Sequence, residues 1–221
     1  RTDLVGRAIS TVEKNLIEGA LIVIFVLVLF LGNLRAGLIV ASAIPLSMLF
    51  AFGLMNVFGV SANLMSLGAI DFGLIVDGAV IIVEATLHHL GLRKSMQRLT
   101  QTEMDEEVFV SASKIRSSAA FGEIIILIVY IPILTLIGIE GKMFTPMAKT
   151  VGFAILGALI LSLTYIPMMC ALFLPKKINH NKNFSDKMMD FFQRIYQPLL
   201  QKAIQFKYWL VGITVSLFVV S

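Results

Sequence analysis

Three carboxylates stand within one long apolar segment of the chain, where charged side chains are costly. Residues 62–87 read ANLMSLGAIDFGLIVDGAVIIVEATL and contain Asp71, Asp77 and Glu84. A charged side chain at the centre of a bilayer costs about 3 kcal/mol even on lenient insertion scales, so acids in such a segment usually handle protons or ions. No lysine or arginine occurs over residues 36–92, so the segment brings no counter-charge of its own.

Helical geometry separates these acids. At 100° and 1.5 Å per residue, Asp71 and Asp77 lie about 120° apart around the helix axis, whereas Asp77 and Glu84 share a face. Small residues such as Gly73 and Gly78 cover much of the same helix and allow another helix to approach closely. We therefore expect the acids to point into a helix bundle. Burial there disfavours the charged form of a carboxyl group, so Asp77 can bind and release a proton as its environment alternates.

The composition is that of an integral membrane protein. Of the 221 residues, 57% are hydrophobic and 14% are charged, against about a quarter charged in soluble domains. A membrane helix needs about 20 apolar residues, and five apolar runs are long enough. We predict an all-α integral membrane protein, a polytopic bundle of five full transmembrane helices plus a partial sixth, with spans at about 17–34, 37–58, 64–88, 119–139 and 146–174.

Two regions follow this transmembrane bundle, which occupies residues 1–174. Residues 175–206 form a cytoplasmic linker with an amphipathic helix, because apolar residues recur at helical spacing between basic ones. A basic amphipathic helix of this kind lies on a membrane surface. Residues 207–221 form the start of a further transmembrane helix. The chain begins without an initiator methionine or signal sequence, and we expect it to be an internal piece of a larger protein.

The basic residues are unevenly distributed. Thirteen of the 18 lysines and arginines fall in three connections, at 32–36, 88–118 and 175–207. The positive-inside rule places these connections in the cytoplasm and residue 1 outside. Because the basic residues are split among loops and interleaved with acids, the expected partner is the lipid bilayer and no nucleic acid is implied.

The connection between the fourth and fifth spans is predicted as a short outer hairpin over residues 138–146. Thr145 followed by Pro146 fits a helix N-cap with proline at the first helical position. Residues 88–118 are interpreted as a cytoplasmic loop.

The acids and histidines near the end of this segment could also serve other chemistry. Glu84 and His88 share a helix face, and His88 with His89 suggests zinc, but a pair of histidines at the membrane edge is the favoured reading. Glu123, near the cytoplasmic start of the fourth span, is a fourth candidate for a buried acid, but a snorkelling or interfacial role is favoured. Acids that serve only as structural partners of neighbouring groups remain open. The sequence has no HExxH motif and no other catalytic constellation, so no enzyme is predicted.

The segment from Asp71 to Glu84, DFGLIVDGAVIIVE, resembles the signature of the fourth transmembrane helix in heavy-metal efflux pumps of the resistance-nodulation-division superfamily. The similarity is greatest to the cobalt–zinc–cadmium branch. Three further stretches agree, over residues 32–45, 132–146 and 161–173. By this resemblance the chain covers helices two to six of such a pump and the start of helix seven.

Single positions bear on the branch. Drug-exporting relatives tend to carry two adjacent acids where this chain has Asp77 and Gly78. Copper and silver exporters tend to lack the first acid, which is present here as Asp71. Both positions favour divalent ions, whereas Ala85 stands where the family usually has asparagine.

The resemblance implies a proton-driven antiporter that exports divalent cations such as zinc, cobalt, cadmium or nickel. Asp77 would be the central proton carrier, Asp71 a second relay acid and Glu84 an auxiliary. The metal ion and protons are cargo, no bound cofactor is implied, and the main metal site would lie outside these residues. A lysine from another part of the pump would pair with Asp77.

The same resemblance implies a multi-pass protein of the bacterial inner membrane, with residue 1 on the periplasmic side. It would work as a homotrimer joined to a periplasmic adaptor protein and an outer-membrane channel. Two alternatives stay open at this point. One is an exporter of drugs or amphiphiles from the same superfamily, and the other is a non-transporting membrane subunit for protein translocation or sensing.

Overall fold

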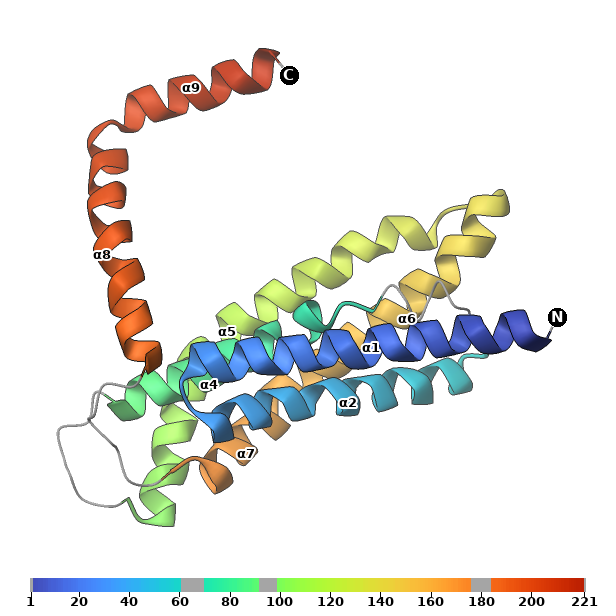
Figure 1. Ribbon diagram of the computed structural model, residues 1–221, viewed down its shortest axis with the longest axis horizontal. Coiled ribbons are helices and arrows are strands. Elements are labelled where there is room, and N and C mark those ends of the chain that lie inside the picture. The colour runs from blue at the N-terminus through green and yellow to red at the C-terminus, as the bar shows by residue number, and fades with distance from the viewer. Residues whose placement is uncertain (1, 61–69, 92–98, 176–183, 221) are drawn as a thin grey trace. The chain divides into compact units, whose positions relative to one another are not determined.

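The computed structural model describes residues 2–60, 70–91, 99–175 and 184–220, and within these ranges every regular element is a helix (Figure 1). The predicted all-α class is thereby confirmed. Two units are distinguished, residues 1–180 and residues 181–221, and each is described by itself. The helices are α1 (Thr2–Leu31), α2 (Leu34–Val57), α4 (Phe72–Gly91), α5 (Gln101–Leu134), α6 (Gly138–Leu163), α7 (Tyr165–Phe173), α8 (Phe184–Gln205) and α9 (Lys207–Val220).

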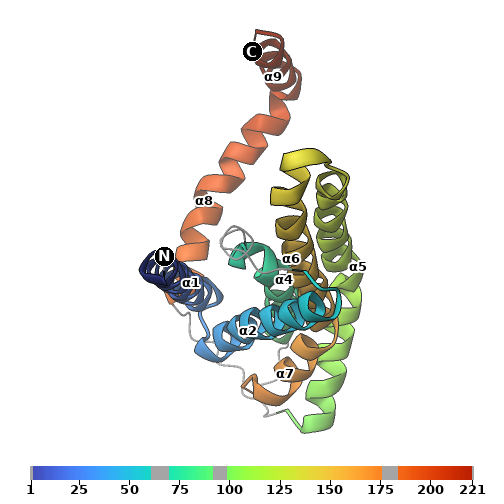
Figure 2. The same ribbon diagram turned by 90° about the vertical axis from the view of Figure 1, so that its right-hand side faces the viewer.

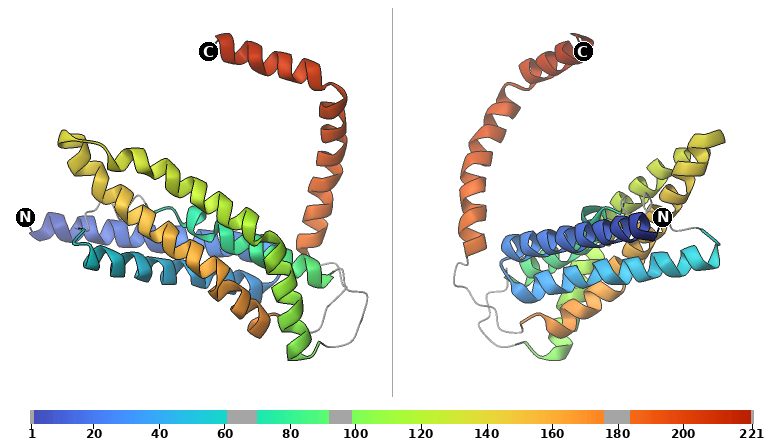
Figure 3. Two further views of the ribbon diagram at one scale, coloured as in Figure 1. Left: turned by 180° about the vertical axis from the view of Figure 1, so that it is seen from behind. Right: turned by 45° about the vertical axis from the view of Figure 1, so that its right-hand side comes forward.

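The core of the first unit lies where α2, α4 and α6 meet, and α5 packs against α4 and α6 (Figure 2). Figure 3 shows α5 and α6 side by side as an antiparallel pair. Small residues line the contacts: a Cβ at Gly157 of α6 would meet the ring of Phe50 on α2. Small residues at membrane-helix interfaces let backbones approach closely. The largest side chains that are fully buried in this core include Val40, Ile75, Ile82, Ile155 and Ile166.

Four helices are long and apolar enough to cross a membrane, judged by length and composition among the described residues: α2, α4, α5 and α6. The apolar part of α1, Ile17–Leu31, is shorter. These five segments fall on the five predicted runs, and the number of complete spans stays a prediction. Many side chains of α5 are apolar and exposed, including Phe121, Ile125 and Ile128, as expected of a helix that faces lipid or further helices.

The third predicted span differs from the structure at its start. Ile70 and Asp71 are not helical, and α4 begins at Phe72. The predicted continuous helix over 64–88 is therefore wrong at these two positions, while residues 61–69 lie outside the described residues. The physical reason is local: Asp71 Oδ1 accepts a hydrogen bond of 2.8 Å from the Gly73 backbone N–H. Aspartate side chains that bond to nearby backbone compete with the helix and favour its beginning.

The predicted loop over 88–118 is wrong in its second half, because α5 begins at Gln101. A capping box starts this helix: the Thr100 backbone N–H donates to Glu103 Oε2 at 2.8 Å, and the Glu103 backbone N–H donates to Thr100 Oγ1 at 3.4 Å. Such reciprocal bonds satisfy two donors that the first turn of a helix leaves free. Residues 92–98 of the predicted loop lie outside the described residues.

The predicted outer hairpin over 138–146 is also wrong. The connection between α5 and α6 consists of residues 135–137, and α6 begins at Gly138, whose φ is +76°. Thr145 caps no helix, and Pro146 stands inside α6. Glycine adopts positive φ without steric cost, so the chain reverses earlier than the Thr-Pro pair suggests. The fifth predicted run is divided at Thr164, between α6 and α7.

The second unit contains α8 and α9. The helix predicted within 182–206 is found as α8, and Phe191, Ile195 and Leu199 are exposed on it at helical spacing. Its placement on a membrane surface stays a prediction, as does the role of α9 as the start of a further span.

Candidate functional site

Asp77 and Glu84 lie on one exposed face of α4. Together with Ile81 and His88 they form an exposed stripe along the helix. The opposite face packs into the core through residues that include Ile75, Val76, Ala79, Ile82 and Val83. The predicted common face of Asp77 and Glu84 is observed. This stripe faces away from the other described helices, so the expectation that the acids point into a bundle stays a prediction.

Asp71 belongs to a different local structure. It is exposed, stands one residue before α4 and caps the first turn through Gly73. The angular relation to Asp77 that we derived from a continuous helix does not apply to it. The structure thus leaves Asp77 and Glu84 on one face of α4 and Asp71 at its beginning.

Among the residues whose burial is described, Glu123 of α5 is the buried acid. Its exposed fraction is 2%, and neither carboxyl oxygen makes a hydrogen bond of normal geometry within the described residues. The side chain reaches α4 at Gly78, where an added Cβ would overlap the carboxyl group. Ser162 of α6 borders the same point, 3.2 Å from that Cβ position, and is itself buried. Glu123 is therefore buried, and the interfacial role favoured from the sequence is wrong in the described structure.

The buried and the exposed acids are linked through α4. Asp77 immediately precedes Gly78, and its charge acts on Glu123. One turn of α4 therefore carries Asp77 on its outer side and contacts Glu123 on its inner side, at Gly78. The sequence contained both acids, but no sequence signal placed Gly78 and Ser162 against Glu123, because three helices far apart in the chain form this junction.

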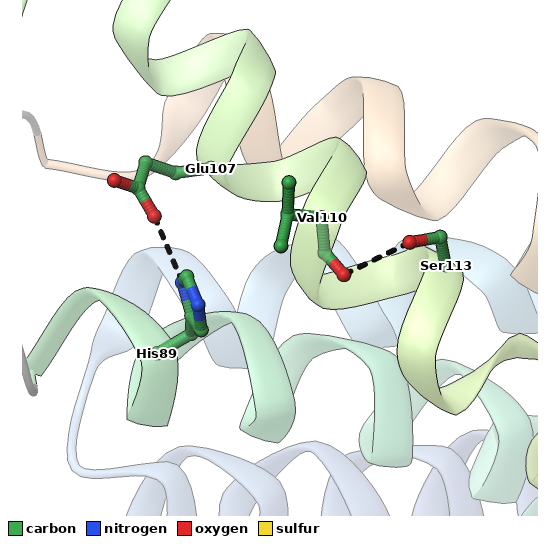
Figure 4. Close-up of polar contacts among 4 residues, drawn as sticks. All are labelled: His89, Glu107, Val110 and Ser113. Atoms are coloured by element: carbon green, nitrogen blue, oxygen red, sulfur yellow. Dashed lines mark hydrogen bonds and ion pairs between the residues drawn. The ribbon is translucent and has the colours of Figure 1, made fainter.

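The histidines at the end of α4 are divided between two environments. His88 is exposed, whereas His89 Nδ1 lies 2.9 Å from Glu107 Oε2 on α5 (Figure 4). Figure 4 also shows Ser113 Oγ donating to the Val110 carbonyl at 3.0 Å further along α5. In the part of the chain that the structure describes, no group of three or more His, Cys, Asp or Glu side chains could hold a metal ion. The partner of His89 was not predicted.

Comparison with known proteins identifies the family. The model of the AcrB/AcrD/AcrF family matches residues 1–221. The chain belongs to this family. It is 51% identical over 206 residues to the cobalt-zinc-cadmium resistance protein CzcA of Cupriavidus metallidurans. The matched region covers 92% of this chain and 19% of that protein. It is 33% identical over 211 residues to the cation efflux system protein CusA of Escherichia coli (strain K12). That match covers 92% of this chain and 20% of CusA.

A solved structure extends the match to three dimensions. The X-ray structure of a heavy metal efflux pump in crystal form II has a TM-score of 0.75 and 36% identity, and covers 98% of this chain and 20% of that chain. The predicted resemblance to heavy-metal efflux pumps of the resistance-nodulation-division superfamily is confirmed. The chain spans about a fifth of the length of the curated relatives that it matches.

Proposed function

We propose that this chain forms part of the proton-translocating membrane domain of a secondary transporter, which exports divalent metal cations in exchange for protons. The observation that carries the proposal is the position of Asp77. It is an ionisable side chain in the second turn of the apolar helix α4, exposed on the face that the described bundle leaves open. Ionisable groups at such positions mark ion and proton pathways.

The chemistry assigned to Asp77 is reversible proton binding. A carboxyl group that gains a cationic neighbour is stabilised as the carboxylate, and one that loses this neighbour takes up a proton. A cation on the open face of α4, supplied by another part of the transporter, would switch Asp77 between these two forms. Glu84 shares that face and would act as an auxiliary, and Asp71 would act as a second relay acid at the beginning of the helix.

The proposed cargo is a divalent ion such as zinc, cobalt, cadmium or nickel. Support comes from the relatives: identity is 51% to the cobalt-zinc-cadmium resistance protein CzcA and 44% to the nickel-cobalt-cadmium resistance protein NccA of Alcaligenes xylosoxydans xylosoxydans, against 33% to CusA. We further propose the setting in which such a pump works. It is a homotrimer in the bacterial inner membrane with residue 1 on the periplasmic side, joined to a periplasmic adaptor and an outer-membrane channel.

The test replaces Asp77 by Asn in the complete transporter, expressed in a metal-sensitive bacterial strain. Asparagine has nearly the same shape and cannot carry a proton. We expect resistance to zinc and cobalt to fall to that of the strain without the transporter. Asp105→Asn is the matched control, because Asp105 is exposed on α5 and bonds only to Gln101 of its own helix among the interactions described. We expect that variant to retain resistance.

Membrane abundance and oligomeric state are measured for both variants, so that loss of assembly is not taken for loss of function. Resistance to zinc and cobalt at the wild-type level in Asp77→Asn would refute the proposal. Resistance to detergents and dyes without resistance to metals would instead favour the drug-exporting relatives.

A further inference from the structure

We propose that Glu123 is a second proton-binding residue of this membrane domain, which holds its proton while α4, α5 and α6 are packed together and releases it when this junction opens. The inference rests on the proposed function and deepens it, because it assigns a proton to a side chain outside α4. We call the contact of Gly78, Glu123 and Ser162 the three-helix junction.

The first argument is the cost of a buried charge. Glu123 is 2% exposed and has no hydrogen bond of normal geometry to either oxygen within the described residues. An ionised carboxylate taken out of water without a cation or several donors costs several kcal/mol, whereas a neutral carboxyl group costs much less. In this packing Glu123 is therefore protonated.

The charged groups around the junction act in the same direction. The charged group of α4 that acts on Glu123 is Asp77, an acid on the outer side of the same turn. The adjoining part of α6, residues 150–163, carries no ionisable side chain, and on α5 itself residues 117–134 carry only Glu123 and Tyr130. No cation is supplied from these segments, and two neighbouring acids do not readily ionise together. Protonation of Glu123 and Asp77 is therefore coupled.

The second argument is the direction of the hydrogen bonds. Ser162 Oγ donates its hydrogen to the Leu159 carbonyl at 3.0 Å. While its hydrogen is donated to Leu159, the hydroxyl offers Glu123 only a lone pair, since a serine hydroxyl has one hydrogen. A lone pair suits a protonated carboxyl group, which can donate to it, and repels a carboxylate. Ser162 bonded to Leu159 thus favours the neutral form of Glu123.

The third argument is access. The carboxyl group occupies space that a side chain at Gly78 would fill, with α4 on one side and α6 on the other. Water does not reach it while the helices are packed, so the proton leaves only when α4 moves away from α5 or α6. Release of the proton then leaves a charge that the closed junction does not tolerate. Proton binding at Glu123 is in this way tied to helix movement, which a proton-driven transporter requires.

The decisive measurement is infrared spectroscopy of the purified complete transporter. A protonated carboxyl group has a C=O stretching band apart from that of a carboxylate. We expect a band of a buried protonated carboxyl group at neutral pH that is lost in Glu123→Gln and kept in Glu140→Gln, where Glu140 is an exposed glutamate at the start of α6. The same carboxyl band in wild type and Glu123→Gln would overturn the proposal.

Ser162→Ala keeps the carboxyl group and provides a second, independent readout. We expect the Glu123 band to shift in this variant, because the hydroxyl that borders the carboxyl group is removed. An unshifted band would contradict an influence of Ser162 on Glu123 even if Glu123→Gln failed to fold.

Transport is measured in proteoliposomes with zinc and an imposed pH gradient. We expect Glu123→Gln to lower proton-coupled zinc flux by about 100-fold or more, in the range that a single proton-transfer group contributes, with the melting temperature unchanged. Glu140→Gln should transport as wild type does. Unchanged flux over the whole pH range in Glu123→Gln would refute a role in proton coupling. If the wild type itself shows no proton-coupled flux, the proposed function fails, and the infrared band still decides whether Glu123 binds a proton.

Discussion

The two faces of α4 present two opposite environments to carboxyl groups. On the outer face, Asp77 and Glu84 are exposed. On the inner face, Glu123 is enclosed by α4, α5 and α6 and lacks access to water. An exposed acid responds to whatever approaches it, while a buried acid responds only to a change in the packing around it. The difference separates a group that can meet an incoming cation from a group that can report helix movement.

The two environments share one turn of a single helix, because Asp77 and Gly78 are adjacent. A shift of α4 that brings Asp77 toward a cation also changes the space available to Glu123. In a packed helix bundle such shifts occur between discrete arrangements, because close-packed interiors deform little. The comparison therefore predicts that both acids act as one unit, and this prediction can be broken by experiment.

The largest effect is expected when Asp77 is replaced, whether alone or together with Glu123. If Asp77 and Glu123 act as one unit, the Asp77→Asn/Glu123→Gln double variant should lose no more zinc flux than Asp77→Asn alone, a loss of about 100-fold or more. Zinc flux in proteoliposomes at a fixed pH gradient is measured for the wild type, the two single variants and the double variant. Losses that multiply would show two independent proton steps, and the link between the two faces would be wrong.

A smaller effect is expected from closing the space at Gly78. In Gly78→Ala the new methyl group would overlap the Glu123 carboxyl group, and overpacking of this kind costs about 1–3 kcal/mol of stability. Gly122→Ala is the matched control, since it lies next to Glu123 on α5 and has open space around its Cβ position. It should leave stability unchanged or raise it by about 0.5–1 kcal/mol, because alanine is the better helix former.

Unfolding in detergent measures both glycine variants, and Glu123→Ala combined with Gly78→Ala completes the test. We expect the double variant to be less destabilised than the sum of the single changes, because removal of the carboxyl group frees the space for the methyl. Strictly additive effects would show that Gly78 and Glu123 do not share this space.

The sequence alone predicted the helical class, the apolar runs and the acids, because hydropathy and composition are local properties. Helical spacing also gave the shared face of Asp77 and Glu84. It did not give the direction of that face, since periodicity fixes angles between residues of one helix and not the neighbours of the helix. The surroundings of Glu123 come from α4, α5 and α6 together, which no local pattern contains.

The errors at helix ends have identifiable causes. The capping box of Thr100 and Glu103 is readable in the sequence, and it would have placed the start of α5 correctly. The sequence offers two possible starts for α6, at Gly138 and at Thr145–Pro146. The chain turns at Gly138, which adopts a positive φ. Asp71 was counted among membrane acids because its segment is apolar, although its side chain bonds to the backbone at the beginning of α4.

The smallest effect is expected from the third kind of carboxylate, one that already has a partner. Glu107 lies 2.9 Å from His89, and the two side chains are 19% and 31% exposed. Partly solvated pairs contribute about 0.2–1 kcal/mol, so the coupling in a double-mutant cycle of His89→Gln and Glu107→Gln should stay below about 1 kcal/mol. The exposed Lys14–Glu18 pair of α1, with 3.7 Å between its charged atoms, serves as the reference cycle, with an expected coupling of about 0.3–0.5 kcal/mol. Zinc flux should be retained in each His89 and Glu107 variant, because the pair joins the ends of α4 and α5 and not the junction around Glu123. A coupling above about 2 kcal/mol exceeds what a solvated pair supplies. Together with loss of flux, it would show that α4 and α5 are coupled through the His89–Glu107 pair and not through the three-helix junction.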